Sequence, residues 1–151
     1  MPHLTLPDPA ATEALGLRLA QALPARAVAY LHGDLGAGKS SLARALLRGL
    51  GVTGTIRSPT YTLVEQYPLA QGALALHLDL YRIGDPGELE FLGLDPEAAR
   101  LWLVEWPQRG QGALPPPDLD IQLALQGAGR ACTLEAQTPA GREWLARAGF
   151  G

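Results

Sequence analysis

A chain of 151 residues, 47% of them hydrophobic, is expected to form one domain, residues 1–151, with a sizeable core. Its net charge of −3 excludes a whole-molecule field that would attract DNA or RNA. Cys132 is the only cysteine, which excludes a disulfide framework and favours a cytoplasmic protein. No apolar stretch approaches the length of a membrane span, so no membrane partner is expected.

The first part of the chain is expected to form a strand, a helix and a second strand. Residues 3–6 are a candidate edge strand, and Asp8 followed by Pro9 is typical of a helix N-cap and first helical residue. Apolar residues at helical spacing continue up to Pro24, where the helix should end. Residues 27–31 are an apolar run typical of a buried strand.

The next stretch, residues 33–40, fits the pattern G-x-x-x-x-G-K-[ST] of a phosphate-binding loop. Its glycines are Gly33, Gly36 and Gly38. Glycine reaches positive φ and has no Cβ, so these positions let backbone N–H groups converge on phosphate oxygens. Lys39 is then expected to reach the β- and γ-phosphates, and the Ser40 hydroxyl to hold magnesium.

The surroundings of this loop favour a nucleotide site. Leucines at helical spacing follow it and predict a helix whose positive N-terminus faces the anion. Of the 12 lysine and arginine residues only Lys39 is a lysine, and a compact ammonium group is not interchangeable with arginine against phosphate. Thr12 lies on the helix that leads into the loop, so it is either a half-buried helix residue or a contact to the base side of the nucleotide.

A polar loop is expected after that helix, at residues 51–59, followed by a loosely alternating strand at residues 60–67. Many phosphate-loop enzymes sense the γ-phosphate with such a segment. Ser58, Thr60 and Thr62 either orient water or contact magnesium there, or they are ordinary turn hydroxyls. Spacing leaves both interpretations open.

Two further strands are expected to end in carboxylates. Residues 73–81 follow a hairpin turn and place Asp79 near the carboxyl end, where ligands bind in open α/β sheets. Residues 101–107 run four apolar residues into Glu105, as in a strand buried on both faces of a parallel sheet. Phosphate-loop enzymes place a magnesium ligand or a water-activating base at such a strand end. Spacing does not say which carboxylate binds metal, although burial is favoured for Glu105.

The remaining expected elements are short helical pieces at residues 88–92 and 96–100, a stiff connector at 114–118, strands at 119–125 and 130–137, and a helix from Thr138. Residues 126–129 between the last two strands indicate a hairpin. The histidines lack the spacing of zinc ligands and are interpreted as structural. These elements predict an α/β fold of the three-layer P-loop NTPase type, with a mostly parallel central sheet, antiparallel additions and a C-terminal hairpin.

Several classes of phosphate-loop protein are disfavoured by what the sequence lacks. A GTPase needs an Asn-Lys-x-Asp reader, and a chain with no asparagine and one lysine cannot form it, so adenine is favoured. A small-molecule kinase should carry an arginine-bearing lid, and Arg82, Arg100 and Arg109 are well separated. The kinase and a non-hydrolysing, nucleotide-gated binding module both remain as alternatives to an ATPase.

Four motifs in order resemble those of the bacterial TsaE (YjeE) family. They are residues 33–41, 58–64, 77–82 and 104–107, and the match extends from about residue 31 to residue 107. Ser40-Ser41 departs from the two threonines more usual in the family, but serine keeps the hydroxyl that magnesium needs.

The resemblance implies a small magnesium-dependent ATPase needed to make threonylcarbamoyladenosine beside the tRNA anticodon. Its partners would be TsaB and TsaD, which carry the transfer chemistry, so that ATP hydrolysis resets the complex and tRNA is reached only through it. The resemblance also places Ser40 and Glu105 at magnesium-ligand positions, Asp79 at a residue needed for activity, and Trp106 at a functionally sensitive aromatic. Residues 58–60 fall on a switch-like loop.

The expected catalytic residues are therefore Lys39, Asp79 and Glu105, with ATP and Mg²⁺ as cofactors. The expected nucleotide-binding residues are Gly33, Asp34, Leu35, Gly36, Ala37, Gly38, Lys39, Ser40 and Ser41, together with Thr12, Thr60 and Trp106. Either Asp79 or Glu105 positions the attacking water. Because the chain shows no obvious arginine finger, hydrolysis is expected to be slow alone and to be completed by partner proteins.

Overall fold

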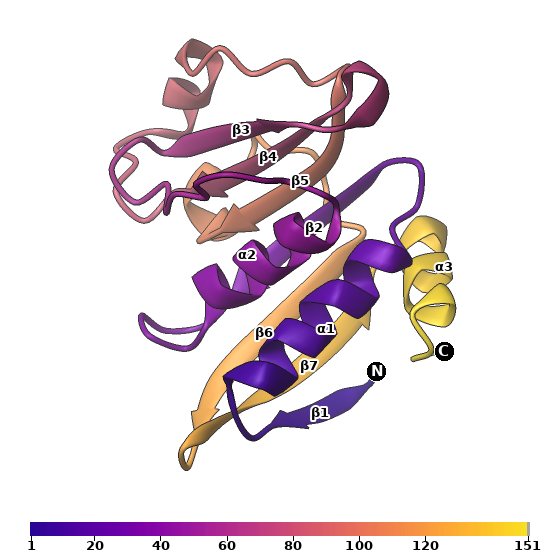
Figure 1. Cartoon of the computed structure of the whole chain (residues 1–151). Coiled ribbons are helices and arrows are strands. Elements are labelled where there is room, and N and C mark those ends of the chain that lie inside the picture. The colour runs from indigo at the N-terminus through magenta and orange to yellow at the C-terminus, as the bar shows by residue number, and fades with distance from the viewer. Residues whose placement is uncertain (151) are drawn as a thin grey trace.

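A seven-stranded sheet in the order β1-β7-β6-β2-β5-β4-β3 runs through the computed structural model, which describes residues 1–150 (Figure 1). The strands are β1 (His3–Leu6), β2 (Ala27–His32), β3 (Val64–Pro68), β4 (Leu74–Asp79), β5 (Ala99–Glu105), β6 (Leu119–Gln126) and β7 (Gly129–Ala136). The α-helices are α1 (Pro9–Gln21), α2 (Lys39–Gly49) and α3 (Pro139–Arg147), and the 3₁₀ segments are η1 (Ala70–Gly72), η2 (Pro86–Phe91) and η3 (Pro107–Gly110).

The centre of the sheet is parallel and its edges are antiparallel. β2 pairs in parallel with β5 and β6, and β4 pairs in parallel with β5. β7 pairs antiparallel with β6, β1 with β7, and β3 with β4. The carboxyl ends of β6, β2, β5 and β4 therefore meet at one edge, where open α/β sheets bind ligands. The predicted α/β fold, with its parallel centre, antiparallel additions and C-terminal hairpin, is confirmed.

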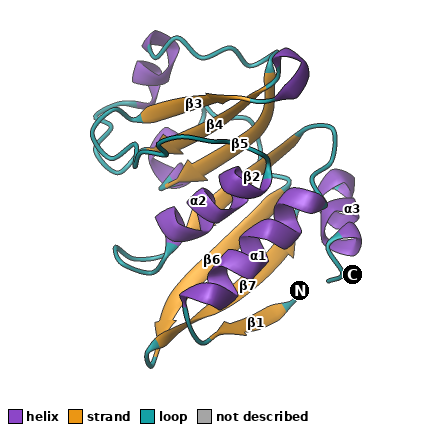
Figure 2. Cartoon of the chain, viewed as in Figure 1, coloured by secondary structure: helices purple, strands orange, loops and turns teal. Residues whose placement is uncertain are grey.

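The two faces of the sheet are covered by different kinds of structure (Figure 2). All three α-helices pack on one face, where Leu19, Leu46 and Trp144 join a single buried cluster with the sheet. On the other face, β4 and β5 are covered by Ile83 and Leu89 from the segment that contains η2. This second layer consists of loops and 3₁₀ turns because glycine and proline recur through residues 84–96 and break any longer helix.

Helices α1 and α2 approach each other closely through glycine. A Cβ on Gly16 would lie 2.5 Å from the Ala45 Cβ and 2.9 Å from the Leu46 backbone nitrogen, and one on Gly49 would lie 2.6 Å from the Ala20 Cβ. Glycine is needed at both positions because neither gap accommodates a side chain. No helix within residues 1–150 is long and apolar enough to cross a membrane.

The predicted helix starts are confirmed by their caps. The Asp8 side chain accepts a hydrogen bond from the Ala11 backbone nitrogen at 2.9 Å, and Pro9 is the first residue of α1. The Thr138 hydroxyl accepts a hydrogen bond from the Gly141 nitrogen at 3.1 Å and begins α3. Each satisfies one of the N–H groups that a helix leaves without an internal partner.

Two predicted elements are wrong in type or extent. The strand predicted at residues 60–67 covers only β3, because Leu63 adopts φ of 68° and donates to the Pro59 carbonyl at 2.8 Å in a tight turn. The helical piece predicted at residues 96–100 is instead a turn followed by the start of β5. The other short piece exists as the 3₁₀ segment η2, one to two residues earlier than predicted.

Candidate nucleotide-binding site

The loop between β2 and α2 has the backbone conformation that its glycines permit. The φ angle is 147° at Gly33, 83° at Gly36 and 103° at Gly38. A Cβ on Gly33 would also clash with the Leu123 carbonyl oxygen of β6, so this glycine permits close contact between loop and strand. Residues with a Cβ rarely adopt such angles, and the loop therefore depends on glycine at these places.

The first turn of α2 has no side-chain cap. Gly38 precedes Lys39, the first helical residue, and has no side chain to accept a hydrogen bond. The N–H groups of a first turn lack internal acceptors, and the helix dipole adds partial positive charge there. This end of α2 is therefore suited to bind an anion such as a phosphate group.

Lys39 lies within the loop with only 5% of its surface exposed. Its Nζ donates to the Gly33 carbonyl at 2.5 Å and lies 3.9 Å from the centre of the Trp106 ring. Burial lowers the pKa of Lys39, while the nearby carboxylates of Glu105, Asp79 and Asp34 oppose that shift. A bound phosphate adds negative charge on the same side as these carboxylates and would favour the charged ammonium.

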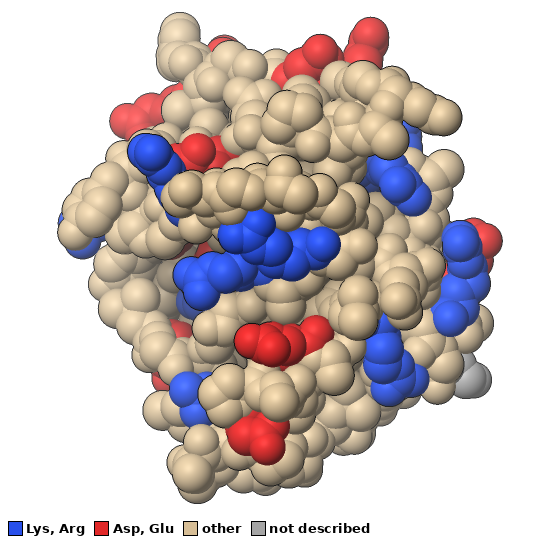
Figure 3. All heavy atoms as spheres, in the orientation of Figure 1, with Lys and Arg blue, Asp and Glu red and all other residues tan. Residues whose placement is uncertain are grey.

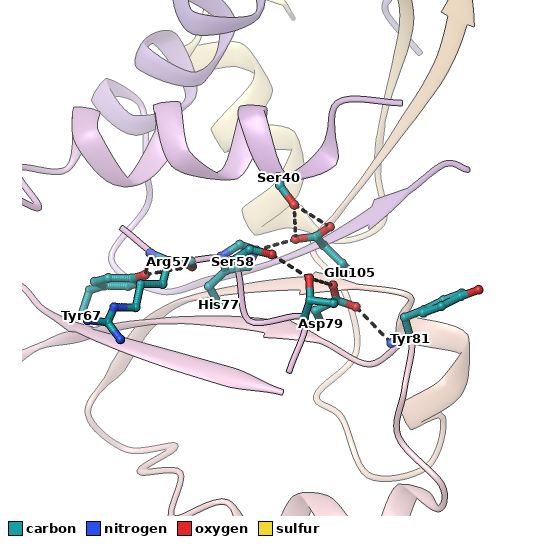
Figure 4. A network of polar contacts seen from close by, with 9 residues as sticks. Ser40, Arg57, Ser58, Tyr67, His77, Asp79, Tyr81 and Glu105 are labelled. Atoms are coloured by element: carbon teal, nitrogen blue, oxygen red, sulfur yellow. Dashed lines mark hydrogen bonds and ion pairs between the residues drawn. The ribbon is translucent and has the colours of Figure 1, made fainter. Parts of the chain in front are cut away.

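Ser40, Glu105 and His77 meet at the carboxyl edge of the sheet (Figure 4). The Ser40 hydroxyl lies 3.3 Å from each carboxylate oxygen of Glu105, which is 2% exposed at the end of β5. The Nε2 atom of His77, in β4, lies 2.6 Å from Glu105 Oε2. The predicted pair of Ser40 and Glu105 is thus brought together from positions 65 residues apart, with a histidine behind it.

Asp79 lies beside Glu105, because the two residues are register partners at the ends of β4 and β5. Asp79 Oδ1 accepts from the Tyr81 backbone nitrogen at 3.0 Å (Figure 4). Its Oδ2 accepts from the Thr60 hydroxyl at 3.4 Å. Thr60 in turn lies 2.7 Å from the Ser58 hydroxyl. The polar loop after α2 therefore reaches the carboxyl edge through Thr60, whereas Thr62 bonds Glu65 instead.

Trp106 follows Glu105 directly and turns the chain. It has a left-handed backbone with φ of 57°, and it precedes η3. Its ring packs against Tyr81 at 4.9 Å between centroids, and the Arg109 guanidinium lies 5.8 Å from its ring centre. A non-glycine residue at positive φ is uncommon, and here the turn places the indole over the Lys39 ammonium.

Two cavities flank the loop. One of about 730 Å³ lies between α1, α2 and the β6–β7 hairpin, and Thr12, Gly38 and Ser41 line it. The other, of about 200 Å³, is lined by Lys39 and Trp106 together with further loop residues. The larger has the volume of a small-molecule site, and it places Thr12 on the same cavity as the loop.

Positive charge gathers at the rim of the larger cavity although the whole chain is negative. Figure 3 shows a group of lysine and arginine side chains over α2. The exposed Arg44 and Arg48 of α2 line this cavity together with Arg130, and they outnumber the two carboxylates there, Asp8 and Glu13. Local charge of this sign favours a phosphate-bearing ligand, independently of the net charge of the molecule.

The other predicted loop residues differ in exposure. Asp34 and Leu35 are exposed at the loop tip, Leu35 to 65%. Ala37 is buried in the core at 1% exposure, and its N–H donates to the Asp34 carbonyl at 3.1 Å, so it presents almost no surface to a ligand.

Arg130 of β7 supports the loop, and motif reasoning missed it. Its Nε donates to the Ala37 carbonyl at 3.0 Å and its Nη2 to the Gly36 carbonyl at 3.2 Å. These two bonds hold the Gly36 and Ala37 carbonyls against β7 and so support the loop. No sequence signal marks Arg130, because it lies more than 90 residues from the loop and in no known motif. His77, which the sequence indicates only as a structural histidine, is buried and contacts Glu105.

The donors at the edge suit magnesium better than zinc. Residues 1–150 contain no group of three or more histidine, cysteine or acidic side chains placed to hold a metal ion. Ser40 and Glu105 instead offer a hydroxyl and a carboxylate beside the phosphate-binding turn. Magnesium in nucleotide sites typically takes one or two protein oxygens and completes its shell with phosphate and water. The residues present therefore fit a nucleotide-bound magnesium.

Parallel strands, a glycine loop and an uncapped helix N-terminus that carries G-x-x-x-x-G-K-S define a P-loop nucleotide-binding protein. The sequence matches the family described as "Threonylcarbamoyl adenosine biosynthesis protein TsaE" over residues 6–132. The chain belongs to the TsaE family, as its four motifs predicted.

Individual relatives agree with this assignment. A Haemophilus influenzae protein named "tRNA threonylcarbamoyladenosine biosynthesis protein TsaE" is 46% identical over 115 residues, covering 75% of this chain and 72% of its own. A protein of the same name from Aquifex aeolicus is 36% identical over 116 residues, covering 76% and 80%. The crystal structure of Bacillus subtilis YdiB matches with a TM-score of 0.78 and 25% identity, covering 98% of this chain and 93% of that one.

Proposed function

We propose that this protein is the ATP-hydrolysing component of the machinery that forms threonylcarbamoyladenosine beside the tRNA anticodon, acting with TsaB and TsaD. The proposal is carried by the convergence of Ser40 and Glu105 at 3.3 Å beside the glycine loop. A hydroxyl from the first helical turn and a carboxylate from a neighbouring strand end are the groups with which phosphate-loop ATPases hold a metal-bound nucleotide. The biosynthetic role follows from the names of the relatives.

The nucleotide is proposed to be ATP. The loop N–H groups and Lys39 hold the phosphates, and the larger cavity, with Thr12 on its wall, accepts the nucleoside. Guanine is disfavoured because the usual Asn-Lys-x-Asp reader cannot be formed from a chain without asparagine.

Magnesium would be held by Ser40 and Glu105. When bound, it supplies positive charge that offsets the charge developing on the β- and γ-phosphate oxygens during transfer. Glu105 is already engaged by the Ser40 hydroxyl and by His77, so it suits the metal better than it suits the attacking water. This division of roles assigns the water to the other carboxylate.

Asp79 is proposed to orient the attacking water. Its Oδ2 has only the long contact of 3.4 Å to Thr60, so it retains the capacity to accept a proton from water. Thr60 and Ser58 lie on the loop that links this carboxylate to solvent, and they would report whether the γ-phosphate is present. Positioning and electrostatics supply most of the acceleration in such sites.

The partner complex is proposed to complete the site. Tyr61 beside Thr60 is 83% exposed and Leu35 at the loop tip is 65% exposed. Large apolar side chains at the mouth of a charged site are suited to contact another protein. We therefore expect slow hydrolysis by the isolated chain and faster hydrolysis with TsaB and TsaD.

The test compares ATP hydrolysis by the purified protein with and without TsaB and TsaD, for the wild type and for Glu105→Ala. Turnover should rise with the partners and fall at least about 100-fold in Glu105→Ala, the scale expected when a catalytic electrostatic group is removed. Glu135→Ala, which removes an exposed carboxylate of β7, is the matched control and should match the wild type.

Two results would contradict the proposal: no stimulation by the partners, together with unchanged turnover in Glu105→Ala. ATP-dependent association with TsaD and TsaB without any turnover would instead identify a nucleotide-gated binding module. Transfer of phosphate to a hydroxyl acceptor rather than to water would identify a kinase.

A further inference from the structure

His77 is a polar residue in the middle of a buried strand. It is 2% exposed, and it shares the α2 face of β4 with Ala75 and Asp79, because side chains alternate along a strand. Strands in the parallel part of a sheet are buried on both faces and usually carry apolar residues there. Burying an imidazole at such a position costs free energy unless a hydrogen bond compensates for it.

The only polar contact of the His77 side chain within residues 1–150 is to Glu105. Nε2 lies 2.6 Å from Glu105 Oε2, whereas Nδ1 is buried and has no hydrogen-bond partner. Most buried histidines use both ring nitrogens, often one of them on a backbone carbonyl. Here the ring makes one hydrogen bond, to a carboxylate oxygen, and makes none to the backbone.

Glu105 needs such a partner to keep one orientation. Its contacts to the Ser40 hydroxyl are both 3.3 Å, long for a bond to a carboxylate and nearly symmetric between the two oxygens. They do not fix the rotation of the carboxyl group. The bond from His77, from the neighbouring strand, is much shorter and involves Oε2 alone, so it defines which oxygen points back into the sheet.

We infer that His77 is a positioning residue, which holds Glu105 Oε2 from behind and thereby directs Oε1 toward the metal position beside Ser40. The inference rests on the proposed function, since it assigns His77 a role toward the magnesium of that site. Groups that orient a metal-binding side chain in this way typically change metal affinity by 10- to 100-fold when removed. His77 itself is not assigned as a ligand, because its Nε2 is already occupied.

Substituting His77 by glutamine or by asparagine distinguishes a role in orienting Glu105 from a role in packing. The side-chain nitrogen of glutamine reaches roughly where imidazole Nε2 lies, whereas that of asparagine ends near Nδ1. His77→Gln therefore retains the donor to Glu105 and His77→Asn removes it, although both leave a smaller side chain. His3→Asn, at the exposed N-terminal edge strand, is the control.

The measurement is the affinity for a non-hydrolysable ATP analogue, with magnesium and with EDTA. In His77→Asn we expect the gain in affinity on adding magnesium to fall about 10-fold, whereas affinity in EDTA stays within about 2-fold of the wild type. His77→Gln and His3→Asn should retain the gain to within about 3-fold. Equal losses in the Gln and Asn variants would overturn the inference in favour of a packing role, as would an unchanged gain in His77→Asn.

A second measurement needs neither nucleotide nor metal. Proton NMR of the ligand-free wild type should show a slowly exchanging imidazole N–H signal at low field, and Glu105→Ala should lose it. Absence of that signal would overturn the inference even if His77→Asn fails to fold. A wild type that binds the analogue equally well with and without magnesium would instead contradict the proposed magnesium site, while the NMR signal would still report the His77–Glu105 bond.

Discussion

At the scale of single residues, the members of the candidate site were predictable where a short motif indicates the chemistry. Lys39 and Ser40 follow from the phosphate-loop pattern, and Glu105 from its place after an apolar strand. His77 and Arg130 were not predictable, because each acts through contacts to residues that are distant in the sequence. Single-sequence reasoning reads local spacing, whereas these two roles depend on strand register and on the position of the hairpin.

Cys132 provides a residue-scale prediction about pH. It is 1% exposed in β7, and burial raises the pKa of its thiol to about 12, against about 8.5 in an unfolded chain. As pH rises above about 8.5 the unfolded chain releases this proton first, so the free energy of unfolding should fall by about 1.4 kcal/mol per pH unit. Urea unfolding at a series of alkaline pH values measures this slope.

Cys132→Ala is the control for this effect, since its slope should be shallower by the contribution of the thiol. Equal slopes in the two proteins would contradict the assignment. Labelling supplies a second check, because a thiol reagent should modify Cys132 only after unfolding.

Arg130 leads to a second residue-scale prediction. Arg130→Ala leaves the Gly36 and Ala37 carbonyls without their guanidinium partner, so the loop should lose part of its preorganisation. We expect ATP affinity to fall about 3- to 10-fold, the range for an ordinary hydrogen bond, because the partly exposed Arg130 supports the loop rather than a buried charge. Titration calorimetry measures it. Arg142→Ala, an exposed arginine of α3, should bind like the wild type, and an unaltered affinity in Arg130→Ala would refute the supporting role.

At the scale of elements, most helices and strands were predictable because caps and apolar periodicity agreed. Asp8-Pro9 and Thr138-Pro139 mark real helix starts, and the glycine-rich residues 126–129 mark the β6–β7 hairpin. The strand expected at residues 60–67 failed because Leu63 takes a left-handed conformation, which periodicity does not reveal. That turn is held by tertiary contact: the Leu63 carbonyl accepts from the Asp79 nitrogen at 3.0 Å.

The contact between α1 and α2 is the basis of an element-scale prediction. Gly16→Val would force a branched side chain against Ala45 and the backbone of Leu46, so the helices must separate. We expect the free energy of unfolding to fall by about 3 kcal/mol, the upper part of the range for overpacking. Gln21→Val, at the exposed end of the same helix, should cost no more than about 0.5 kcal/mol. Denaturant unfolding of both variants measures these changes. Similar unfolding midpoints for the two variants would show that the helices are not tightly packed.

At the scale of the whole molecule, the parallel centre of the sheet gathers the site from distant segments. β2, β4 and β5 end at one edge, so the phosphate loop, Asp79 and Glu105 meet there although the sequence separates them by tens of residues. The order of strands could not be read from the sequence, which suggested a parallel sheet without fixing which strands are neighbours. A three-layer fold was predicted, but that its second outer layer consists of loops and 3₁₀ turns was visible only in the structure.

A ligand that binds this assembled edge should stabilise the entire fold. At an ATP concentration about 100 times its Kd, linkage adds about 2.7 kcal/mol, which for a chain of this length raises Tm by about 5–10 °C. Thermal unfolding with ATP and magnesium measures the shift. Lys39→Ala should show a much smaller shift, because the phosphates lose their buried ammonium partner. A wild type whose Tm does not respond would mean that the edge binds no ATP.

Because side chains alternate between the two faces of a strand, the register between β4 and β5 decides whether both carboxylates face the site. Asp79 stands opposite Glu105, and the intervening residues Leu78 and Val104 face the other way, into the second cluster. Inserting one residue within β4 or β5 would bring Leu78 or Val104 to the edge in place of the carboxylate, and deleting one would bring Leu80 or Trp106. The exposed residues 95–97, by contrast, can accept an insertion without altering which side chains reach the ligand. Engineered insertions should therefore be tolerated at residues 95–97 and abolish the site within either strand.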